Sequence, residues 1–156
     1  MNKLILISLV IFFTICSKSW AEAELIANCE GAYGHAYYHY YGITPKDKSG
    51  WDKDAISKGK FSFKKVDDDK FDLLFIDASQ SITSSIQSGA SIFPVIRTDT
   101  SMTVLVIYPS VVETYSFWQN KDSEYKFALS QSKTGDILLR KNSLMVGSCS
   151  YIDFNY

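Results

Sequence analysis

From residue 61 onward, apolar and polar residues alternate with a period of two. Phe61 and Phe63 alternate with Ser62 and Lys64, and the same alternation recurs over residues 71–77 and 125–130. Such alternation is typical of β-strands that bury one face. Further apolar runs are rich in β-branched and aromatic residues, which strands favour. They cover residues 82–86, 92–96, 102–108, 111–118, 137–139 and 144–149.

Short polar clusters separate these runs and predict tight turns. Examples are Asp67–Lys70, Thr98–Ser101 and Asn120–Ser123, which contain the Asp, Asn and Ser residues that turns favour. Connections this short exclude parallel crossovers, which need a dozen or more residues. We therefore predict an all-β fold, an antiparallel meander of about eight strands. Because closure removes free strand edges, we expect a small, lipocalin-like barrel in preference to a sandwich.

The segment before residue 61 has a different pattern. Residues 30–42 are crowded with tyrosine and histidine, and as a strand they place Tyr33, His35 and Tyr37 on one face. Residues 43–60 are mostly polar, with Trp51 and Ile56 as large apolar anchors. We expect a loop there, with a single helical turn near residues 52–58.

The first 21 residues have the features of a secretory signal peptide. Lys3 precedes an apolar run over residues 4–16, and small residues lie at Ser19 and Ala21. The apolar run is shorter than the ~20 residues that span a bilayer. We expect cleavage before Glu22, a single barrel domain over residues 22–156, no membrane span after cleavage, and a periplasmic or secreted protein.

Cysteine content and charge narrow the picture further. Cys16 leaves with the signal peptide, so Cys29 and Cys149 remain as an even pair in an oxidising compartment. We expect them to form one disulfide between the two ends of the chain. The full chain has 16 basic and 17 acidic residues, a formal net charge of −1. This balance argues against nucleic acid as a partner, since duplex binding requires a clustered basic surface.

A small ligand inside the barrel is the first functional expectation. An eight-stranded barrel either fills with side chains or holds one small ligand. Aromatic residues of two neighbouring strands would line it, with an in-phase glutamate as a polar contact. The candidate ligand-binding residues are Tyr108, Glu113, Tyr115, Phe117 and Trp118. We expect the ligand to be apolar or amphipathic, and the protein to be a monomer.

The alternative is a protein-interaction module, such as a periplasmic inhibitor or an envelope assembly factor. Tyrosine combines a rigid apolar body with a hydrogen-bonding end, which suits protein interfaces. Five tyrosines lie within nine positions of the N-terminal strand and would form the contact surface. They are Tyr33, Tyr37, Tyr38, Tyr40 and Tyr41.

Enzymatic and metal chemistry have weaker signals. The sequence contains no nucleophile elbow, phosphate-binding loop, dinucleotide fingerprint or zinc-protease motif, so we expect a protein that is not an enzyme. Asp77 and Glu113 are carboxylates within apolar runs, and a salt bridge or an outward position is the simplest explanation for them. His35 and His39 have a spacing that permits a shared metal, but no further ligand is evident, so we expect no cofactor.

A succession of short motifs resembles small exported bacterial proteins of no assigned activity. It begins with Trp-x-x-Asp-x-Ile-x-x-Gly at Trp51 and continues through residues 71–77, 107–109, 113–117 and 130–133 to Cys149. The resemblance covers about residues 29–150. It implies export and a β fold, and it implies no active site.

Overall fold

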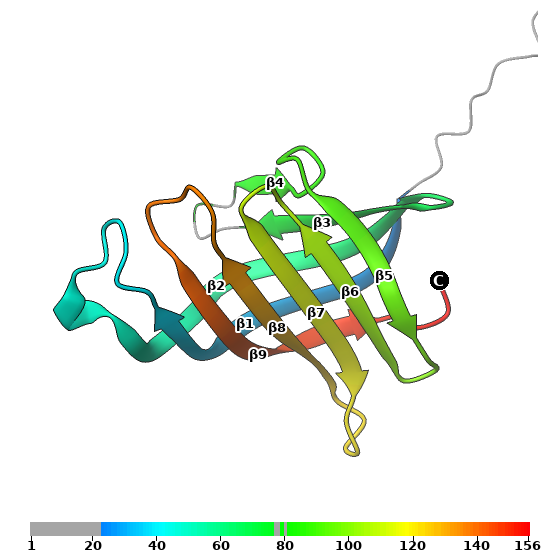
Figure 1. Ribbon diagram of the computed structural model, residues 1–156. Coiled ribbons are helices and arrows are strands. Elements are labelled where there is room, and N and C mark those ends of the chain that lie inside the picture. Colours follow the sequence, from blue (N-terminus) through cyan, green and yellow to red (C-terminus); the bar gives the residue numbers. More distant parts are fainter. Residues whose placement is uncertain (1–22, 77–78, 80) are drawn as a thin grey trace, which may run out of the picture.

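The structure, a computed structural model, describes residues 23–76, 79 and 81–156. Figure 1 shows an all-β chain folded into one antiparallel sheet, which confirms the predicted fold class. A short 3-10 helix, η2 (Lys46–Lys48), lies between the first two strands. The strands are β1 (Glu24–Tyr38), β2 (Gly50–Asp67), β3 (Lys70–Ile76), β4 (Ile82–Ser84), β5 (Ser91–Arg97), β6 (Ser101–Ile107), β7 (Val111–Gln119), β8 (Tyr125–Lys133) and β9 (Lys141–Ile152).

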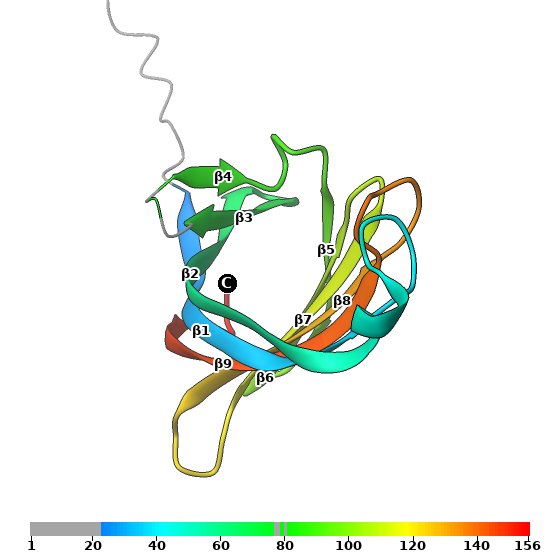
Figure 2. The same ribbon diagram turned by 90° about the vertical axis from the view of Figure 1, so that its left-hand side faces the viewer.

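The nine strands form a meander whose first and last strands pair with each other. The order in the sheet is β4-β3-β2-β1-β9-β8-β7-β6-β5, and every neighbouring pair is antiparallel. The sheet curls into a half-barrel, with β4 and β5 on either side of the open seam (Figure 2). In a simple meander the first and last strands would be the edges of the sheet. Because β1 pairs with β9, these two strands lie in the middle of the sheet, and β4 and β5 are its edges.

The seam is a consequence of strand number. In an alternating sheet with an odd number of strands, the two edge strands point in the same direction. β4 and β5 are therefore parallel in direction, and only residues 85–90 connect them. A parallel pair needs a connection of a dozen or more residues. Among the described residues β4 and β5 do not pair, so the barrel stays open.

The predicted disulfide is confirmed and lies where the two halves of the sheet meet. Cys29 of β1 is directly opposite Cys149 of β9, and their sulfur atoms are bonded. The bond links residues that are 120 positions apart. It therefore covalently joins the two strands that bring the ends of the meander together.

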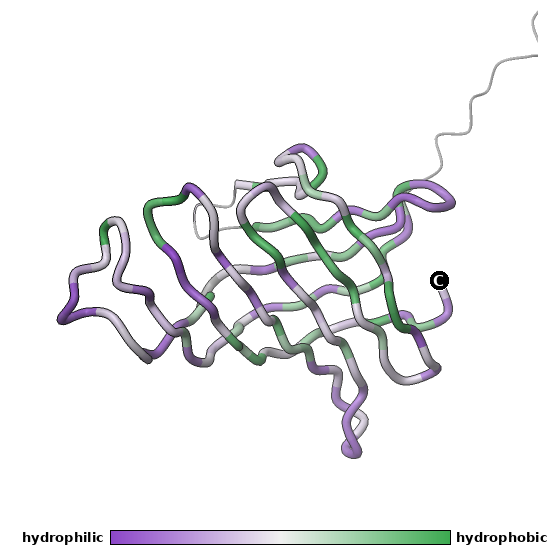
Figure 3. The backbone as a smooth tube through the Cα atoms, in the orientation of Figure 1, coloured by the Kyte–Doolittle hydropathy of each residue, from purple (hydrophilic) through white to green (hydrophobic). Residues whose placement is uncertain are grey.

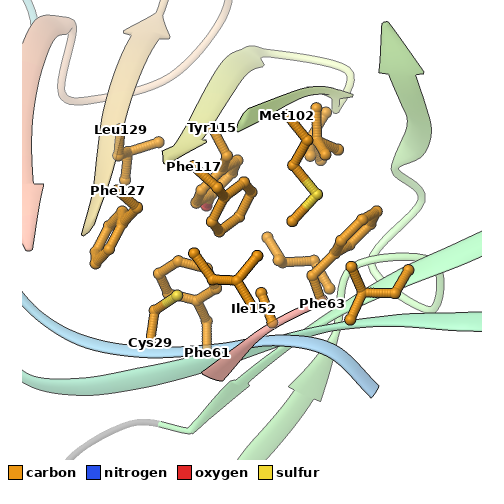
Figure 4. Close-up of a cluster of buried hydrophobic side chains, with 14 of the residues drawn as sticks. Cys29, Phe61, Phe63, Met102, Tyr115, Phe117, Phe127, Leu129 and Ile152 are labelled. Carbon is orange, nitrogen blue, oxygen red and sulfur yellow. The ribbon is translucent and has the colours of Figure 1, made fainter. Parts of the chain in front are cut away.

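The interior is lined by alternate residues of the strands, as the period of two predicts. In β7 the side chains of Glu113, Tyr115 and Phe117 are buried, while their neighbours are more exposed. Figure 3 shows apolar residues concentrated along the strands and polar ones at the turns. In Figure 4, Phe61, Phe63 and Phe127 converge with Tyr115, Phe117 and Met102 in the barrel interior.

The prediction of a loop over residues 43–60 holds for residues 43–49, but it was wrong for residues 50–60, where the helical turn was also expected. β2 begins at Gly50 and pairs with β1 over Ala32–Tyr38. Its alternation is concealed because Asp54 occupies an inward position where a strand normally carries an apolar residue. Asp54 is instead neutralised by Lys141 of β9, and both side chains are mostly buried.

The apolar run over residues 137–139 is also not a strand, although the sequence predicted one. It lies in the β8–β9 connection and bonds with the β1–β2 connection: Ile43 N–H donates to the Leu138 carbonyl at 3.1 Å. The described part of the chain contains no helix long and apolar enough to cross a membrane. The predicted signal peptide (residues 1–21) and Asp77 lie outside the described residues.

Candidate functional site

The barrel interior is filled by aromatic side chains. The Phe61 ring contacts those of Phe127, Tyr115 and Phe117, with centroids 4.8, 5.2 and 6.1 Å apart. A void of about 10 Å³ remains beside Phe61 and Gly31. That volume is about enough for one water molecule. The predicted ligand-binding residues Tyr115 and Phe117 therefore pack as core side chains in this conformation.

Glu113 is buried, and no cation among the described residues pairs with it. The Tyr115 hydroxyl donates a hydrogen bond to Glu113 Oε2 at 2.8 Å, and Gln131 Nε2 donates to Oε1 at 2.6 Å. Both arginines are engaged elsewhere: Arg97 bonds the Tyr156 carbonyl, and Arg140 bonds the Gly135 carbonyl. Two neutral donors thus stabilise a carboxylate for which the sequence suggested a salt bridge or an outward position.

A second buried carboxylate lies nearby and holds the turn after β4. Asp72 accepts hydrogen bonds from the Ser84 hydroxyl at 2.7 Å and from Ile86 N–H at 3.2 Å. The Tyr108 hydroxyl and Ser85 Oγ are 2.8 Å apart. Burial raises the pKa of the Tyr108 phenol above its usual value of 10.0, and both Glu113 and Asp72 add to this effect. These hydrogen bonds tie the turn after β4 to β3 and to Tyr108.

Trp118 does not share the inward face of the other predicted ligand-binding residues. It follows Phe117 on β7, and successive side chains of a strand point to opposite faces. Only Tyr108, Glu113, Tyr115 and Phe117 are therefore directed toward the interior or its rim.

The buried tyrosine makes stability sensitive to alkaline pH. Burial raises the pKa of the Tyr115 phenol well above 10.0, and the Glu113 carboxylate raises it further. The unfolded chain loses this proton first, so the stability present below about pH 10 falls as pH rises toward the folded-state pKa. In the wild-type protein the free energy of unfolding should therefore fall as the pH rises above about 10. We expect Tyr115→Phe to make this decrease smaller by up to about 1.4 kcal/mol per pH unit. Urea unfolding at pH values from about 9 to 11 measures this; equal slopes for the two proteins would contradict it.

The outer face of the sheet carries a row of exposed aromatic and aliphatic side chains. Tyr33 is 71% exposed and Trp51 is 73% exposed, which is far more than large aromatics in a core retain. Leu144 of β9 is 58% exposed. We call this surface the outer aromatic face. It consists of Tyr33, His35 and Tyr37 of β1, Trp51 of β2, and Leu144 and Val146 of β9.

Strand register makes the outer aromatic face continuous. Tyr37 is opposite Trp51, and their rings meet edge to face with centroids 5.6 Å apart. On the other side of β1, Tyr33 is opposite Val146 and His35 is opposite Leu144. Directly opposite residues on neighbouring strands have adjacent side chains on one face. Three strands therefore contribute to a single surface.

The five predicted contact tyrosines are divided among three places. Tyr33 and Tyr37 belong to the outer aromatic face. Tyr38 is on the opposite face of β1, beside Asp54, and burial raises the pKa of its phenol above 10.0. β1 ends at Tyr38, so Tyr40 and Tyr41 lie in the following loop, where the Arg140 guanidinium stacks on the Tyr41 ring at 3.5 Å.

The two histidines are separated by the end of β1. His35 is on the outer aromatic face, whereas His39 lies in the loop, where Asn142 Nδ2 donates to its Nε2 at 3.0 Å. Among the described residues no group of three or more His, Cys, Asp or Glu side chains gathers that would hold a metal ion.

Two larger hollows lie at the surface. One, of about 480 Å³, is formed by the β1–β2 connection with Trp51 and Leu139. The other, of about 540 Å³, follows β5 along the seam and includes Phe71 and Tyr156.

Sequence reasoning missed Trp51, Leu144 and Val146 as parts of the surface. Trp51 was assigned to a loop, and the apolar run over residues 144–149 gave no sign of which apolar side chains face outward. The pairing of Tyr37 with Trp51 depends on a β1–β2 ladder that the sequence did not reveal.

Comparisons with protein-family models, with curated proteins and with solved structures found no match.

Proposed function

We propose that this protein is an exported, non-enzymatic interaction module that binds a protein partner through its outer aromatic face. The observation that carries the proposal is the continuous exposure of Tyr33, Trp51 and Leu144 across three strands. Apolar surface costs free energy in water unless a partner covers it. Contiguous exposed apolar patches on soluble proteins mark interaction sites.

The chemistry of this face is that of a protein interface. Tyrosine and tryptophan dominate binding hot spots because they bury a large area with few rotatable bonds. Polar groups border the patch, with Lys53 opposite His35 on β2 and Asn142 opposite Tyr37 on β9. An apolar centre with a polar rim is the usual composition of a protein contact.

The expectation of an internal small ligand has less support. A ligand inside the barrel would require space there, and the void beside Phe61 has a volume of only about 10 Å³. Ligand pockets usually measure about 300 Å³ or more.

The disulfide accords with export to an oxidising compartment, the periplasm or the medium.

Site-specific photo-crosslinking in the exporting cell tests the proposal. A photoreactive residue at position 37 is expected to give one discrete crosslinked protein, and one at Lys121, in the β7–β8 turn, is expected to give none. Tyr33→Ala combined with Trp51→Ala is expected to weaken the partner's binding at least about 30-fold, because hot-spot truncations cost about 2 kcal/mol or more.

The control variant is Tyr151→Ala, which removes an exposed tyrosine of similar type away from the face. Equal crosslinking at positions 37 and 121, or equal weakening by Tyr151→Ala, would refute the proposed surface. Circular dichroism and thermal unfolding of each variant show whether the fold is intact.

A further inference from the structure

We infer that the hollow beside Trp51 is a second binding site, which takes up a neutral pyranose sugar. The hollow, of about 480 Å³, lies between the β1–β2 connection and Leu139 of the β8–β9 connection. Its volume is within the range of small-molecule sites, about 300–1,000 Å³. The inference goes beyond the proposed function, although the hollow adjoins the outer aromatic face and Trp51 borders both.

The walls of the hollow are held in place by contacts between the two connections. Figure 2 shows the connections side by side, and Ile43 N–H donates to the Leu138 carbonyl at 3.1 Å. Gly42 lies so close to the same carbonyl that a Cβ atom would not fit there. Within the β1–β2 connection, Lys48 N–H donates to the Pro45 carbonyl at 3.0 Å. A hollow built in this way is preorganised, which lowers the ordering cost of binding.

Trp51 supplies a flat aromatic surface for a sugar ring. It lines the hollow and is 73% exposed, so most of the indole is available to a ligand. The edge-to-face contact with Tyr37, at 5.6 Å between centroids, restrains the orientation of the indole. The face of an aromatic ring is electron-rich, whereas the C–H groups on a pyranose face carry partial positive charge. The two faces therefore attract each other when they stack, and the sugar hydroxyls then point to the sides.

Polar groups around the hollow match the hydroxyls of such a ligand. Thr44 lines the hollow and is only 7% exposed, and its hydroxyl forms no hydrogen bond with any described residue. A ligand hydroxyl would provide the missing partner. Asp52 also lines the hollow; its Oδ1 accepts a hydrogen bond from Lys53 N–H at 2.7 Å, and no described residue bonds its Oδ2. Because hydroxyls both donate and accept, they satisfy such a mixture of groups.

The charges of the lining favour a neutral ligand over an ion. Asp47, Lys48 and Asp52 all line the hollow, and none of them forms an ion pair with a described residue. An ion of either sign would therefore meet a like charge. The nearby ion pair of Asp54 with Lys141 is already neutral. An apolar molecule would remove water from these polar groups without replacing its hydrogen bonds, whereas a sugar replaces them.

Tryptophan fluorescence titration tests the inference. Trp118→Phe leaves Trp51 as the one tryptophan after residue 21, so its emission reports on the hollow. The probes are the methyl pyranosides of glucose, galactose, mannose and N-acetylglucosamine. At least one is expected to shift the emission saturably, with a dissociation constant below about 10 mM. The methyl glycosides of glucuronic acid and glucosamine, which carry opposite charges, are expected to bind no more tightly than that sugar.

Matched variants, compared by ligand-detected NMR, separate the hollow from the outer aromatic face. Thr44→Val keeps the side-chain shape and is expected to weaken sugar binding about fivefold, the effect of one neutral hydrogen bond. Trp51→Ala is expected to weaken it about tenfold or more, and Trp51→Phe, which keeps a ring, less. Tyr33→Ala is expected to leave it unchanged, and circular dichroism shows whether each variant is folded.

Three results would overturn the inference. They are no saturable shift by any of the four neutral pyranosides up to about 50 mM, tighter binding of either charged glycoside, and equal binding by wild type, Thr44→Val and Trp51→Ala. The Thr44→Val protein is expected to keep its crosslink at position 37. Loss of the sugar and loss of the protein partner are therefore separate results.

Discussion

Replacing Cys29 and Cys149 together by serine is expected to lower the free energy of unfolding by about 4 kcal/mol. The disulfide closes a loop between residues 120 positions apart, and in the chain-entropy model such a loop restricts the unfolded chain strongly. Because small domains are stable by only about 5–15 kcal/mol, the loss is a large part of the total. Thermal unfolding should shift downward by about 10–15 °C.

Chemical reduction of the wild-type protein provides an independent comparison for this variant. Reduction and double substitution are expected to lower the midpoint by similar amounts, since both remove the same link between β1 and β9. Ser148→Ala, next to Cys149 on β9, controls for a general effect of substitution in this strand. A shift of less than about 3 °C in the reduced protein would show that the β1–β9 ladder holds without the bond.

Phe61→Ala is expected to lower the free energy of unfolding by about 3–5 kcal/mol. The Phe61 side chain is 5% exposed and contacts four other aromatic rings, those of Phe75, Tyr115, Phe117 and Phe127. Its removal joins a phenyl-sized space to the void of about 10 Å³ that it already borders. The cost combines lost burial with an unfilled cavity.

The same substitution also tests whether side-chain packing is what keeps ligands out of the barrel. Benzene is expected to raise the unfolding midpoint of Phe61→Ala and leave that of the wild-type protein unchanged, because dry apolar cavities take up such molecules. Phe61→Leu retains most of the volume and is expected to lose less than about 1.5 kcal/mol. A clear stabilisation of the wild-type protein by benzene would revive the internal-ligand expectation.

Strand periodicity predicted the faces of the second half of the chain well. Glu113, Tyr115 and Phe117 were placed in phase, and all three are buried on the inner face of β7. The same rule assigns Trp118 to the other face, so its inclusion among the interior residues contradicted the periodicity itself. Local alternation is informative here because each strand has one buried face.

Periodicity failed where the sheet extends past the barrel. β1, β2 and β9 continue beyond the aromatic core, and some of their inward positions there are charged, as with Asp54 and Lys141. Because charged residues occupy both faces of β2 here, the sequence of residues 50–58 has the polar composition of a loop. The outer aromatic face depends on this ladder, because Trp51 reaches Tyr37 only through the β1–β2 register.

The sequence by itself determined the all-β class, the antiparallel connections and the pairing of two cysteines, because period, turn chemistry and cysteine count are local properties. Only the tertiary structure decided which strand edges stay open, whether the interior is filled, and which tyrosines share a surface. Those features depend on strand parity, on the summed volume of distant side chains, and on the register between strands. Each is a relation between residues far apart in the chain, and no short window of sequence contains it.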